Sequence, residues 1–317
     1  MNASGARDLQ MIEQALLADD LQFIAEFRQA TEQLDRAAAD APPGTILVAV
    51  DGALESMQAV HWAAMLARTN GADIRIVHAF RWRSYPLDYG VSELGDLSVQ
   101  QAGEDICSSA VDLASAVAPG SRVNGTIVAG TPGPAIVHAA KGAALIVLGG
   151  SRLGLLRSLL GASTLPYVVK HVRCTVAVLP AAESAPPRFL TAPPRVSVCV
   201  DGSAGDGPAL AEALRIASAG MFELLVVCAA GAEQTTRTAL AALRRHVPMP
   251  ALERMTANDQ VVDTLARLAS SSQAVVCDRS QLVLNKPWRG RAGRRLIRDA
   301  ACPVLLTCTA ANDPGGR

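Results

Sequence analysis

Aromatic residues and net charge are what this sequence has least of. Only 3% of its 317 residues are aromatic although 50% are hydrophobic, so any core must be built mainly from alanine, valine, leucine and isoleucine. Lysine and arginine number 29, as do aspartate and glutamate, and this balance gives no electrostatic attraction to nucleic acid or to an anionic membrane. We therefore predict that neither is a partner.

Long apolar runs and paired cysteines are also missing. No run approaches the roughly 18–20 residues that span a bilayer, and the first residues, MNASGARDLQMIEQ, lack the pattern of a signal peptide. The seven cysteines form no CxxC pair, and zinc sites need paired ligand spacing. Five of them lie in or beside apolar runs, as small buried residues do in a reducing compartment: Cys174, Cys199, Cys228, Cys302 and Cys308. These absences predict a cytoplasmic protein without a metal site.

Catalytic signatures are absent from the sequence. There is no Walker lysine, no HExxH motif and no paired-carboxylate motif. Asp51, His78 and Ser151 could converge, but no nucleophile elbow accompanies them. We assign no catalytic residue.

The length predicts two domains behind an N-terminal extension. Residues 1–40 carry apolar side chains at roughly helical spacing, including Phe23 and Phe27. This helical extension either packs on the domain surface or serves as a docking or dimerisation element for a protein partner. We place the first domain at 44–180, a linker at 181–194 and the second domain at 195–310.

Apolar stretches of strand length alternate with helical patterns in both domains. We expect first-domain strands at 45–50, 74–79, 121–128, 145–148 and 174–179, and second-domain strands at 196–200, 224–228, 251–255 and 274–277, with a last one within 298–308. A loop is expected at 81–98, before a helix at 101–117. The alternation predicts an α/β fold of two tandem, open, parallel five-stranded sheets with helices on both faces, of Rossmann-like type.

The stretch 147–163, VLGGSRLGLLRSLLGAS, is the best candidate for a ligand loop. A buried strand that runs into glycines and then a helix can hold phosphate, because main-chain N–H groups and the helix N-terminus both face the anion. Ordinary glycine-rich turns also connect strands to helices without a ligand.

The second domain repeats landmarks of the first. ILVAVDGA (46–53) matches VSVCVDGS (196–203), and KHVRCTVAVLP (170–180) matches RDAACPVLLTC (298–308). An internal repeat with these strand motifs indicates a duplicated domain.

These motifs resemble the universal stress protein family in its tandem two-domain form. They are Val50-Asp51-Gly52 after the first strand, the Gly130-x-Pro132 turn, LIVLGGS at 145–151, RCTVAV at 173–178 and Cys302-Pro303-Val304. The resemblance covers about residues 45–180 and, less closely, 195–308. It implies a stress-response protein whose domains self-associate through the edge strands at 176–179 and 304–307.

The resemblance also implies a nucleotide site. In the ATP-binding branch of the family, the aspartate after the first strand contacts adenine and a G-x2-G-x9-G-[ST] loop holds the phosphates, so ATP is the expected cofactor and Mg²⁺ would accompany it. The loop here departs from that pattern, with shorter spacing between Gly150 and Gly161 and an alanine at the Ser/Thr position. The candidate nucleotide-binding residues are Val50, Asp51, Gly52, His78, Leu148, Gly149, Gly150, Gly154, Gly161, Ala162 and Ser163.

Three residues of the first domain, His78, Trp82 and Tyr85, have two interpretations each. His78 ends the second strand at the carboxyl edge, where it either touches a base or is a polar cap. Trp82 and Tyr85 either form a lid over a ligand or pack down for lack of core elsewhere.

The second domain departs further from the nucleotide-binding pattern. Its fourth strand leads into Cys277-Asp278-Arg279-Ser280 without a glycine, and a carboxylate there would repel phosphate. A cluster of arginines follows, which is either an anion site of its own or, as we prefer, a solvated helix start: Arg289, Arg291, Arg294 and Arg295. We expect this degenerate domain to be structural.

Three functions remain open at this stage. The first is a regulatory module that binds nucleotide in the first domain. The second is an interaction or dimerisation scaffold that has lost nucleotide binding. The third, which we favour least, is an enzyme, with at most weak ATP hydrolysis, because no general base or metal-ligand pair is evident.

Overall fold

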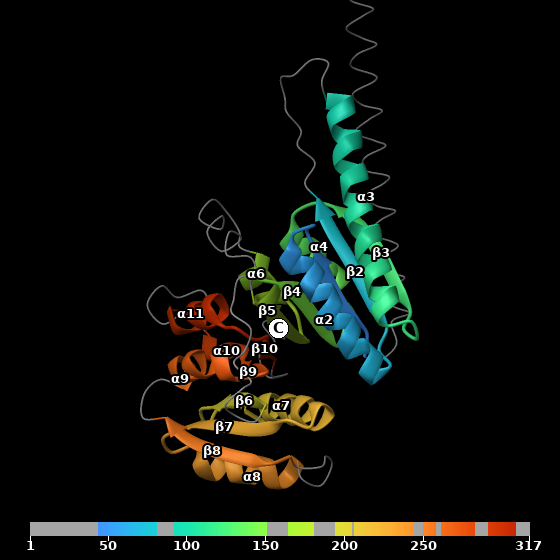
Figure 1. Ribbon diagram of the computed structural model, residues 1–317. Helices are drawn as coiled ribbons and strands as arrows, with labels where there is room; N and C mark the ends of the chain where they lie inside the picture. The colour runs from blue at the N-terminus through green and yellow to red at the C-terminus, as the bar shows by residue number, and fades with distance from the viewer. Residues whose placement is uncertain are drawn as a thin grey trace, which may run out of the picture.

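The computed structural model describes residues 44–80, 92–150, 164–180, 194–204, 206–243, 250–257, 261–282 and 291–308 (Figure 1). Residues 1–40 and all but the last residue of the predicted linker lie outside this part of the chain. The docking interpretation of the N-terminal extension therefore stays a prediction.

The first half alternates strands and helices along the chain. Its elements are β1 (Ile46–Val50), α2 (Leu54–Asn70), β2 (Ile74–Phe80), α3 (Ser92–Val117), β3 (Val123–Ala129), α4 (Pro132–Ala139), β4 (Leu145–Gly149), α6 (Thr164–His171) and β5 (Thr175–Leu179). The inner strands β1, β2, β4 and β5 form because their apolar runs are buried on both faces, as in parallel sheets generally, whereas the edge strand β3 is largely exposed.

The second half repeats this order with shorter helices. Its elements are β6 (Arg195–Val200), α7 (Asp206–Gly220), β7 (Glu223–Ala229), α8 (Glu233–Leu243), β8 (Leu252–Ala257), α9 (Val261–Leu268), the 3₁₀ turn η2 (Ala269–Ser271), β9 (Ala274–Asp278), α10 (Arg279–Leu282), α11 (Arg291–Asp299) and β10 (Val304–Thr307).

One sheet of ten strands runs through both halves, in the order β3-β2-β1-β4-β5-β10-β9-β6-β7-β8. Neighbouring strands are parallel within each half, and β5 pairs antiparallel with β10 where the halves meet. The predicted α/β fold is confirmed, and the two five-stranded sets join into one sheet along the strands at 176–179 and 304–307, the edges at which the family resemblance implies that the domains associate. Joining satisfies the main-chain groups that an edge strand would otherwise expose.

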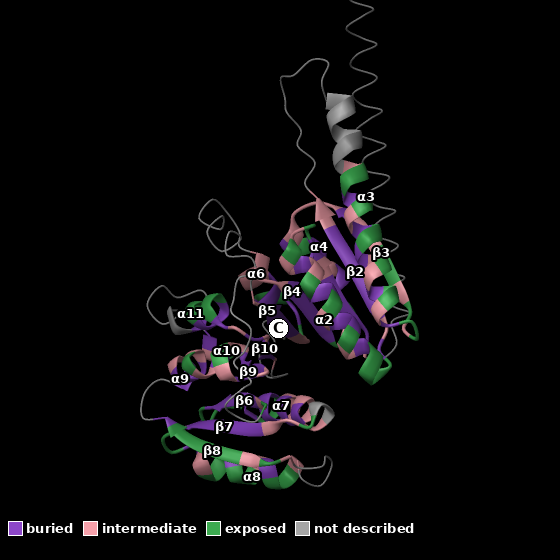
Figure 2. Cartoon of the chain, in the orientation of Figure 1, coloured by how far each residue is buried: buried purple, intermediate pink, exposed green. Residues whose placement is uncertain are grey.

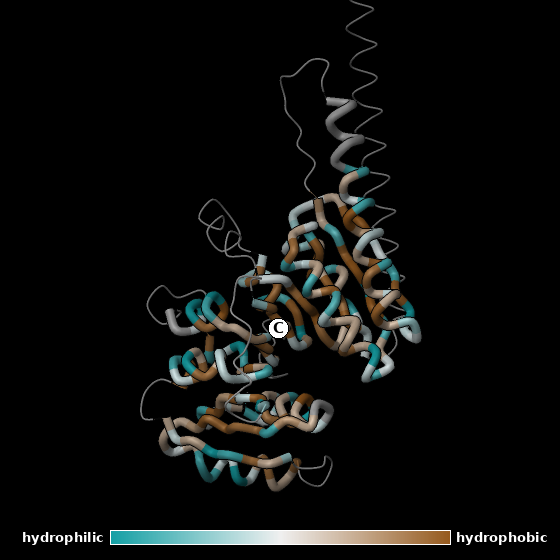
Figure 3. The backbone as a smooth tube through the Cα atoms, viewed as in Figure 1, coloured by the Kyte–Doolittle hydropathy of each residue, from teal (hydrophilic) through white to brown (hydrophobic). Residues whose placement is uncertain are grey.

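Helices cover both faces of this sheet (Figure 1). One apolar cluster combines strand residues with α2, α3, α7 and α8, and the other combines them with α4, α6, α9, α10 and α11. Corresponding helices of the two halves thus share a face. Figures 2 and 3 show the result: the inner strands are buried and hydrophobic, the edge strands β3 and β8 carry exposed residues, and the outer surfaces of the helices are exposed and polar.

Small side chains bring the helices close to the sheet. The buried face of α2 consists of Ser56, Ala59, Val60, Ala63, Ala64 and Ala67. This is how a chain with few aromatic residues builds a core, because alanine lets the helix backbone approach the strands closely. Among the described helices, none combines the length and apolar character that crossing a bilayer requires.

Helix α3 begins earlier than the sequence predicts. The loop expected at 81–98 gives way to helix at Ser92, and residues 81–91, with Trp82 and Tyr85, lie outside the described part. The interpretation of residues 92–98 as loop was therefore wrong. Gly95 and the surrounding polar residues weakened the helical signal, but they continue directly into the apolar periodicity of the following turns.

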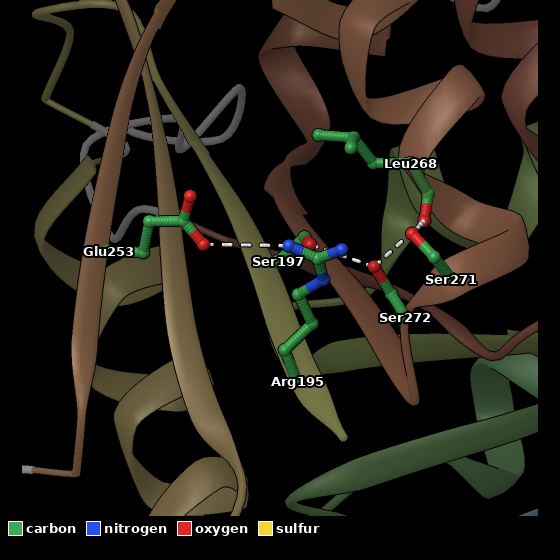
Figure 4. Close-up of polar contacts among 6 residues, drawn as sticks. All are labelled: Arg195, Ser197, Glu253, Leu268, Ser271 and Ser272. Atoms are coloured by element: carbon green, nitrogen blue, oxygen red, sulfur yellow. Dashed lines mark hydrogen bonds and ion pairs between the residues drawn. The ribbon is translucent and has the colours of Figure 1, made fainter. Parts of the chain in front are cut away.

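Polar contacts fasten the amino ends of the second-half strands (Figure 4). The hydroxyls of Ser197 and Ser272 are 2.8 Å apart, and Ser272 also donates to the main-chain oxygen of Leu268 at 2.9 Å. Arg195 Nη1 reaches Glu253 Oε2 at 3.5 Å. These contacts lie at the edge opposite the carboxyl ends of the strands and leave that edge to the candidate site.

Candidate functional site

The order of the strands creates a switch point in each half. From β1 the chain moves outward to β2 and β3, then returns to the other side of β1 as β4. In open α/β sheets, ligands bind outside the carboxyl ends of the strands at such a point. In the first half these ends belong to β1 and β4, which pair in parallel with Ala49 beside Leu148.

Asp51 organises the turn that follows β1. Its Oδ1 accepts the N–H of Ala53 at 3.0 Å, and its own N–H donates to Ser56 Oγ at 3.3 Å. Gly52 between them has a φ of +82°, a conformation that glycine adopts without strain. Asp51 itself is exposed, and its carboxylate fixes the turn at the carboxyl end of β1.

Gly149 lets β4 approach the start of α2. A Cβ at this position would lie 2.7 Å from the main-chain carbonyl carbon and oxygen of Glu55. Helix α2 is preceded by Ala53, which provides no side-chain cap, so the helix N-terminus lies uncapped against the end of β4. This contact joins the Asp51 turn to the glycine loop.

Gly150 continues the close packing on the other side of β4. Its N–H donates to the Leu179 carbonyl oxygen at 2.8 Å, and a Cβ would collide with that same oxygen. Both glycines at the start of the predicted loop therefore have a packing role that needs no ligand.

His78 is held inside the fold. It is 8% exposed, and its Nδ1–H donates to the Val50 carbonyl oxygen at 2.9 Å. Because a carbonyl only accepts, this bond places the proton on Nδ1. The ring also packs on α3, where a Cβ at Gly103 would lie 3.1 Å from its Cδ2. This position matches the polar-cap interpretation of His78 better than direct contact with a base.

The remaining predicted residues divide between packed and undescribed positions. Val50 and Leu148 are buried at the ends of β1 and β4. The rest of the glycine loop, residues 151–163, lies outside the described part: Gly154, Gly161, Ala162 and Ser163. Of the predicted site, the structure thus brings together the Asp51 turn, the Gly149–Gly150 pair and the uncapped start of α2.

The second half keeps the same turn. Asp201 Oδ1 accepts the N–H of Ser203 at 3.0 Å, as Asp51 does with Ala53, and Gly202 has a φ of +89°. Burial alone would raise the pKa of Asp201, but hydrogen bonds, first from Ser203 and then from Gln281, outweigh it and hold the pKa below its usual value.

A second carboxylate lies under this turn. Asp206 occupies the place of Ser56, and its carboxylate accepts the N–H groups of Asp201 at 3.1 Å and Gly202 at 2.7 Å. Asp206 is only 2% exposed, and burial raises its pKa to about 6. Neither Ser56 nor Asp206 was predicted from the sequence as part of the turn, although each follows its aspartate by five positions.

A third carboxylate stands where the first half has Gly149. Asp278 is fully buried at the end of β9, and its Oδ1 accepts both the N–H and the hydroxyl of Ser280. Its Oδ2 has no hydrogen-bond partner among the described residues. Three carboxylates, those of the exposed Asp201 and of the buried Asp206 and Asp278, thus lie at this end of the second half, and repulsion of phosphate there stays a prediction.

The structure describes only part of the arginine cluster that follows β9 in the sequence. Arg294 and Arg295 are exposed on α11, and Arg295 lies 3.7 Å from Asp299 on the same helix. Arg289 and the side chain of Arg291 are outside the described part. Within the described residues, no group of three or more histidine, cysteine, aspartate or glutamate side chains is arranged to hold a metal ion.

Comparison with known proteins identifies a family model that matches the first half and relatives that match a longer part of the chain. The model of the universal stress protein family matches residues 43–180. A universal stress protein of Mycobacterium tuberculosis is 33% identical over 193 residues, covering 57% of this chain and 62% of that protein, and one from Mycobacterium bovis matches equally. The matched part is therefore less than two thirds of the length of these relatives.

Solved structures share the fold of both halves. A universal stress protein from Archaeoglobus fulgidus aligns with 86% of this chain and 98% of its own, at a TM-score of 0.66 and 15% identity. A protein of unknown function from Pseudomonas aeruginosa aligns with 84% of this chain and 93% of its own, at a TM-score of 0.51 and 15% identity. These likenesses establish the architecture.

Proposed function

Because the chain belongs through residues 43–180 to the universal stress protein family, we propose that its first half binds an adenine nucleotide and acts as a regulatory module in a stress response. In this proposal adenine lies near Asp51, and the phosphates lie on the loop that begins at Gly149. The second half does not bind nucleotide and supports the first through the shared sheet.

The observation that carries this proposal is the meeting of three features at one switch point. The exposed Asp51 carboxylate follows β1, the Gly149–Gly150 pair follows β4, and the uncapped N-terminus of α2 lies against Gly149. A carboxylate suits the amino group of adenine, while helix N-terminal N–H groups attract anions. The same place in the second half holds three carboxylates instead.

Two matched variants test which half of the chain binds nucleotide. Asp51→Asn keeps Oδ1 for the Ala53 N–H and replaces Oδ2 with a donor, so the turn survives but the acceptor for the adenine amino group is lost. Asp201→Asn makes the same change in the second half. By isothermal titration with ATP and ADP, we expect Asp51→Asn to weaken binding about tenfold, in line with the loss of one hydrogen bond to a charged group, and Asp201→Asn to leave it unchanged.

A second candidate function has its own support. Gly149 and Gly150 are explained by packing alone, and a protein that binds no nucleotide could act as an interaction scaffold of the same fold. Denaturing the purified protein and identifying released nucleotide, followed by the titration, decides between them. No released nucleotide and no heat with either ligand would leave the scaffold as the function.

Several finer expectations remain predictions. They are a Mg²⁺ ion bound with ATP, weak ATP hydrolysis, self-association between chains, a protein partner for the N-terminal extension, and a cytoplasmic location. Self-association between chains would need a surface other than the edges of β5 and β10, because these two strands already pair within the chain.

A further inference from the structure

Two cysteines flank the seam between the halves, which is the antiparallel pair of strands β5 and β10. Cys174 immediately precedes β5, and Cys308 immediately follows β10. The antiparallel ladder pairs Val304 with Val178 and Leu306 with Val176. Each step along this ladder moves the two partners by one residue in opposite directions. Continued two residues past the last printed pair, this register brings Cys308 opposite Cys174, and the influence of Cys308 on the pKa of Cys174 agrees with their closeness.

The two thiols also share a face of the sheet. Side chains alternate along a strand, so Cys174 lies on the same face as Val176, and Cys308 on the same face as Leu306. Val176, Leu306 and Cys174 belong to or pack on one apolar cluster. Directly opposed antiparallel residues have Cα atoms about 4.5–5.5 Å apart, within the roughly 4.4–6.8 Å that a disulfide spans.

Exposure distinguishes this pair from the other cysteines. All seven cysteines lie in the described part of the chain, where the structure holds each as a thiol, and only Cys174 and Cys308 are partly exposed. Cys199 and Cys277 are 1% and 0% exposed on neighbouring parallel strands, where a solution oxidant does not reach them. The seam pair is therefore the accessible one.

The local charges favour Cys308 as the first thiol to react. Burial, with a smaller contribution from the nearby Cys308, raises the pKa of Cys174 to about 11 although Arg279 counteracts it. Burial also raises the pKa of Cys308, with a smaller contribution from Asp278, but Arg279 and Arg173 both counteract it, whereas Cys174 has Arg279 alone. The reactive species is the thiolate, so oxidation at this seam is slow at neutral pH and begins at the thiol beside the two arginines.

We propose that Cys174 and Cys308 are a redox site whose oxidation by a peroxide joins the two halves through a disulfide. The Cys308 thiolate attacks one peroxide oxygen, the O–O bond breaks, and the departing hydroxide takes a proton to become water. The Cys174 sulfur then displaces hydroxide from the sulfenic acid, forming the S–S bond and a second water. Two thiols and one hydrogen peroxide thus give one disulfide and two waters.

The consequence is a covalent bond between the two halves where β5 pairs with β10. In the reduced protein, β5 and β10 are held by the ladder and by Arg279, which donates to main-chain oxygens of α6 in the first half. A disulfide would close a long loop of chain and restrict separation of the halves in the unfolded state. This goes beyond nucleotide binding and does not depend on it.

Peptide mapping of the full chain tests the proposal. After treatment with hydrogen peroxide and blocking of remaining thiols, trypsin should yield peptide 174–188 linked to peptide 299–317, and dithiothreitol should release both. Because 299–317 also contains Cys302, the Cys302→Ala variant must keep the link while Cys308→Ser must lose it. We expect the oxidised protein to melt at least roughly 5 °C higher than the reduced protein.

Two results would overturn the proposal. One is conversion of Cys174 and Cys308 to sulfinic or sulfonic acids with no linked peptide in the wild-type chain. The other is a linked peptide found only in a species of dimer size on a non-reducing gel, which would place the bond between chains. Both results are obtained with the wild-type protein, so they test the proposal even if a variant fails to fold.

Discussion

Arg279 of the second half donates from Nη1 to the main-chain oxygen of Val172 at 2.6 Å, and it also reaches Val169 at 3.0 Å. Both oxygens lie at the end of α6 in the first half. The last carbonyls of a helix have no partner within it, so a guanidinium from the other half satisfies them. Arg75 makes a similar contact inside the first half, donating to the Ala139 oxygen at the end of α4 at 2.7 Å.

Replacing Arg279 with methionine should weaken the junction between the halves. The apolar stem is retained, but two carbonyls at the end of α6 lose a charged donor, at a cost of about 1.5–3 kcal/mol in the free energy of unfolding. Urea denaturation followed by circular dichroism measures this. Arg298→Met is the matched control, because Arg298 pairs with its neighbour Asp299 on the exposed side of α11. Equal stability of the two variants would contradict a fastening role for Arg279.

Adding one methyl group at Gly149 should destabilise the first half. The Cβ of Gly149→Ala would lie 2.7 Å from main-chain atoms of Glu55, and main chain moves less readily than a side chain. We expect a loss of about 1–3 kcal/mol, as for other overpacked sites. Gly120→Ala is the control, because a Cβ there meets nothing within 4 Å. Thermal melts of both variants check the prediction. An unchanged melting temperature for Gly149→Ala would contradict the close approach of α2 to β4.

Much of the fold was predictable from local sequence. Continuous apolar runs such as Ile46–Val50 mark buried parallel strands. The repeat of Asp51-Gly52 at Asp201-Gly202 predicted a duplicated domain, and the structure shows the same turn in both halves. These features depend on residues near one another in the chain, so periodicity and motif matching can find them.

The site was less predictable because its contacts join distant segments. The packing reason for Gly149 is the backbone of Glu55, and the ring of His78 is buried by Gly103 on α3. A glycine after a strand looks the same in the sequence whether it makes room for a ligand or for a neighbouring helix. The carboxylate of Asp206 was missed for a related reason, since only the folded turn shows that it replaces Ser56.

Asp206 makes stability depend on pH in a direction opposite to that of most surface carboxylates. Its folded-state pKa is raised to about 6, above the value of about 3.9 for an unperturbed aspartate. Between these values the folded protein binds more protons than the unfolded chain, so the contribution of Asp206 to the free energy of unfolding falls as pH rises. A shift of about two units corresponds to at most about 3 kcal/mol.

Substituting Asp206 with serine, the residue at the corresponding place in the first half, isolates this contribution. The free energy of unfolding of the wild type, minus that of Asp206→Ser, should decrease by about 1–3 kcal/mol between pH 4 and pH 7, because only the wild type must ionise a buried carboxyl group. Urea titrations at several pH values measure it. Asp105→Ser on the exposed side of α3 should give a difference that does not decrease in this window. Parallel pH profiles for the wild type and Asp206→Ser would show that the two main-chain N–H groups compensate fully for burial, and that the second-half turn tolerates the carboxylate without loss.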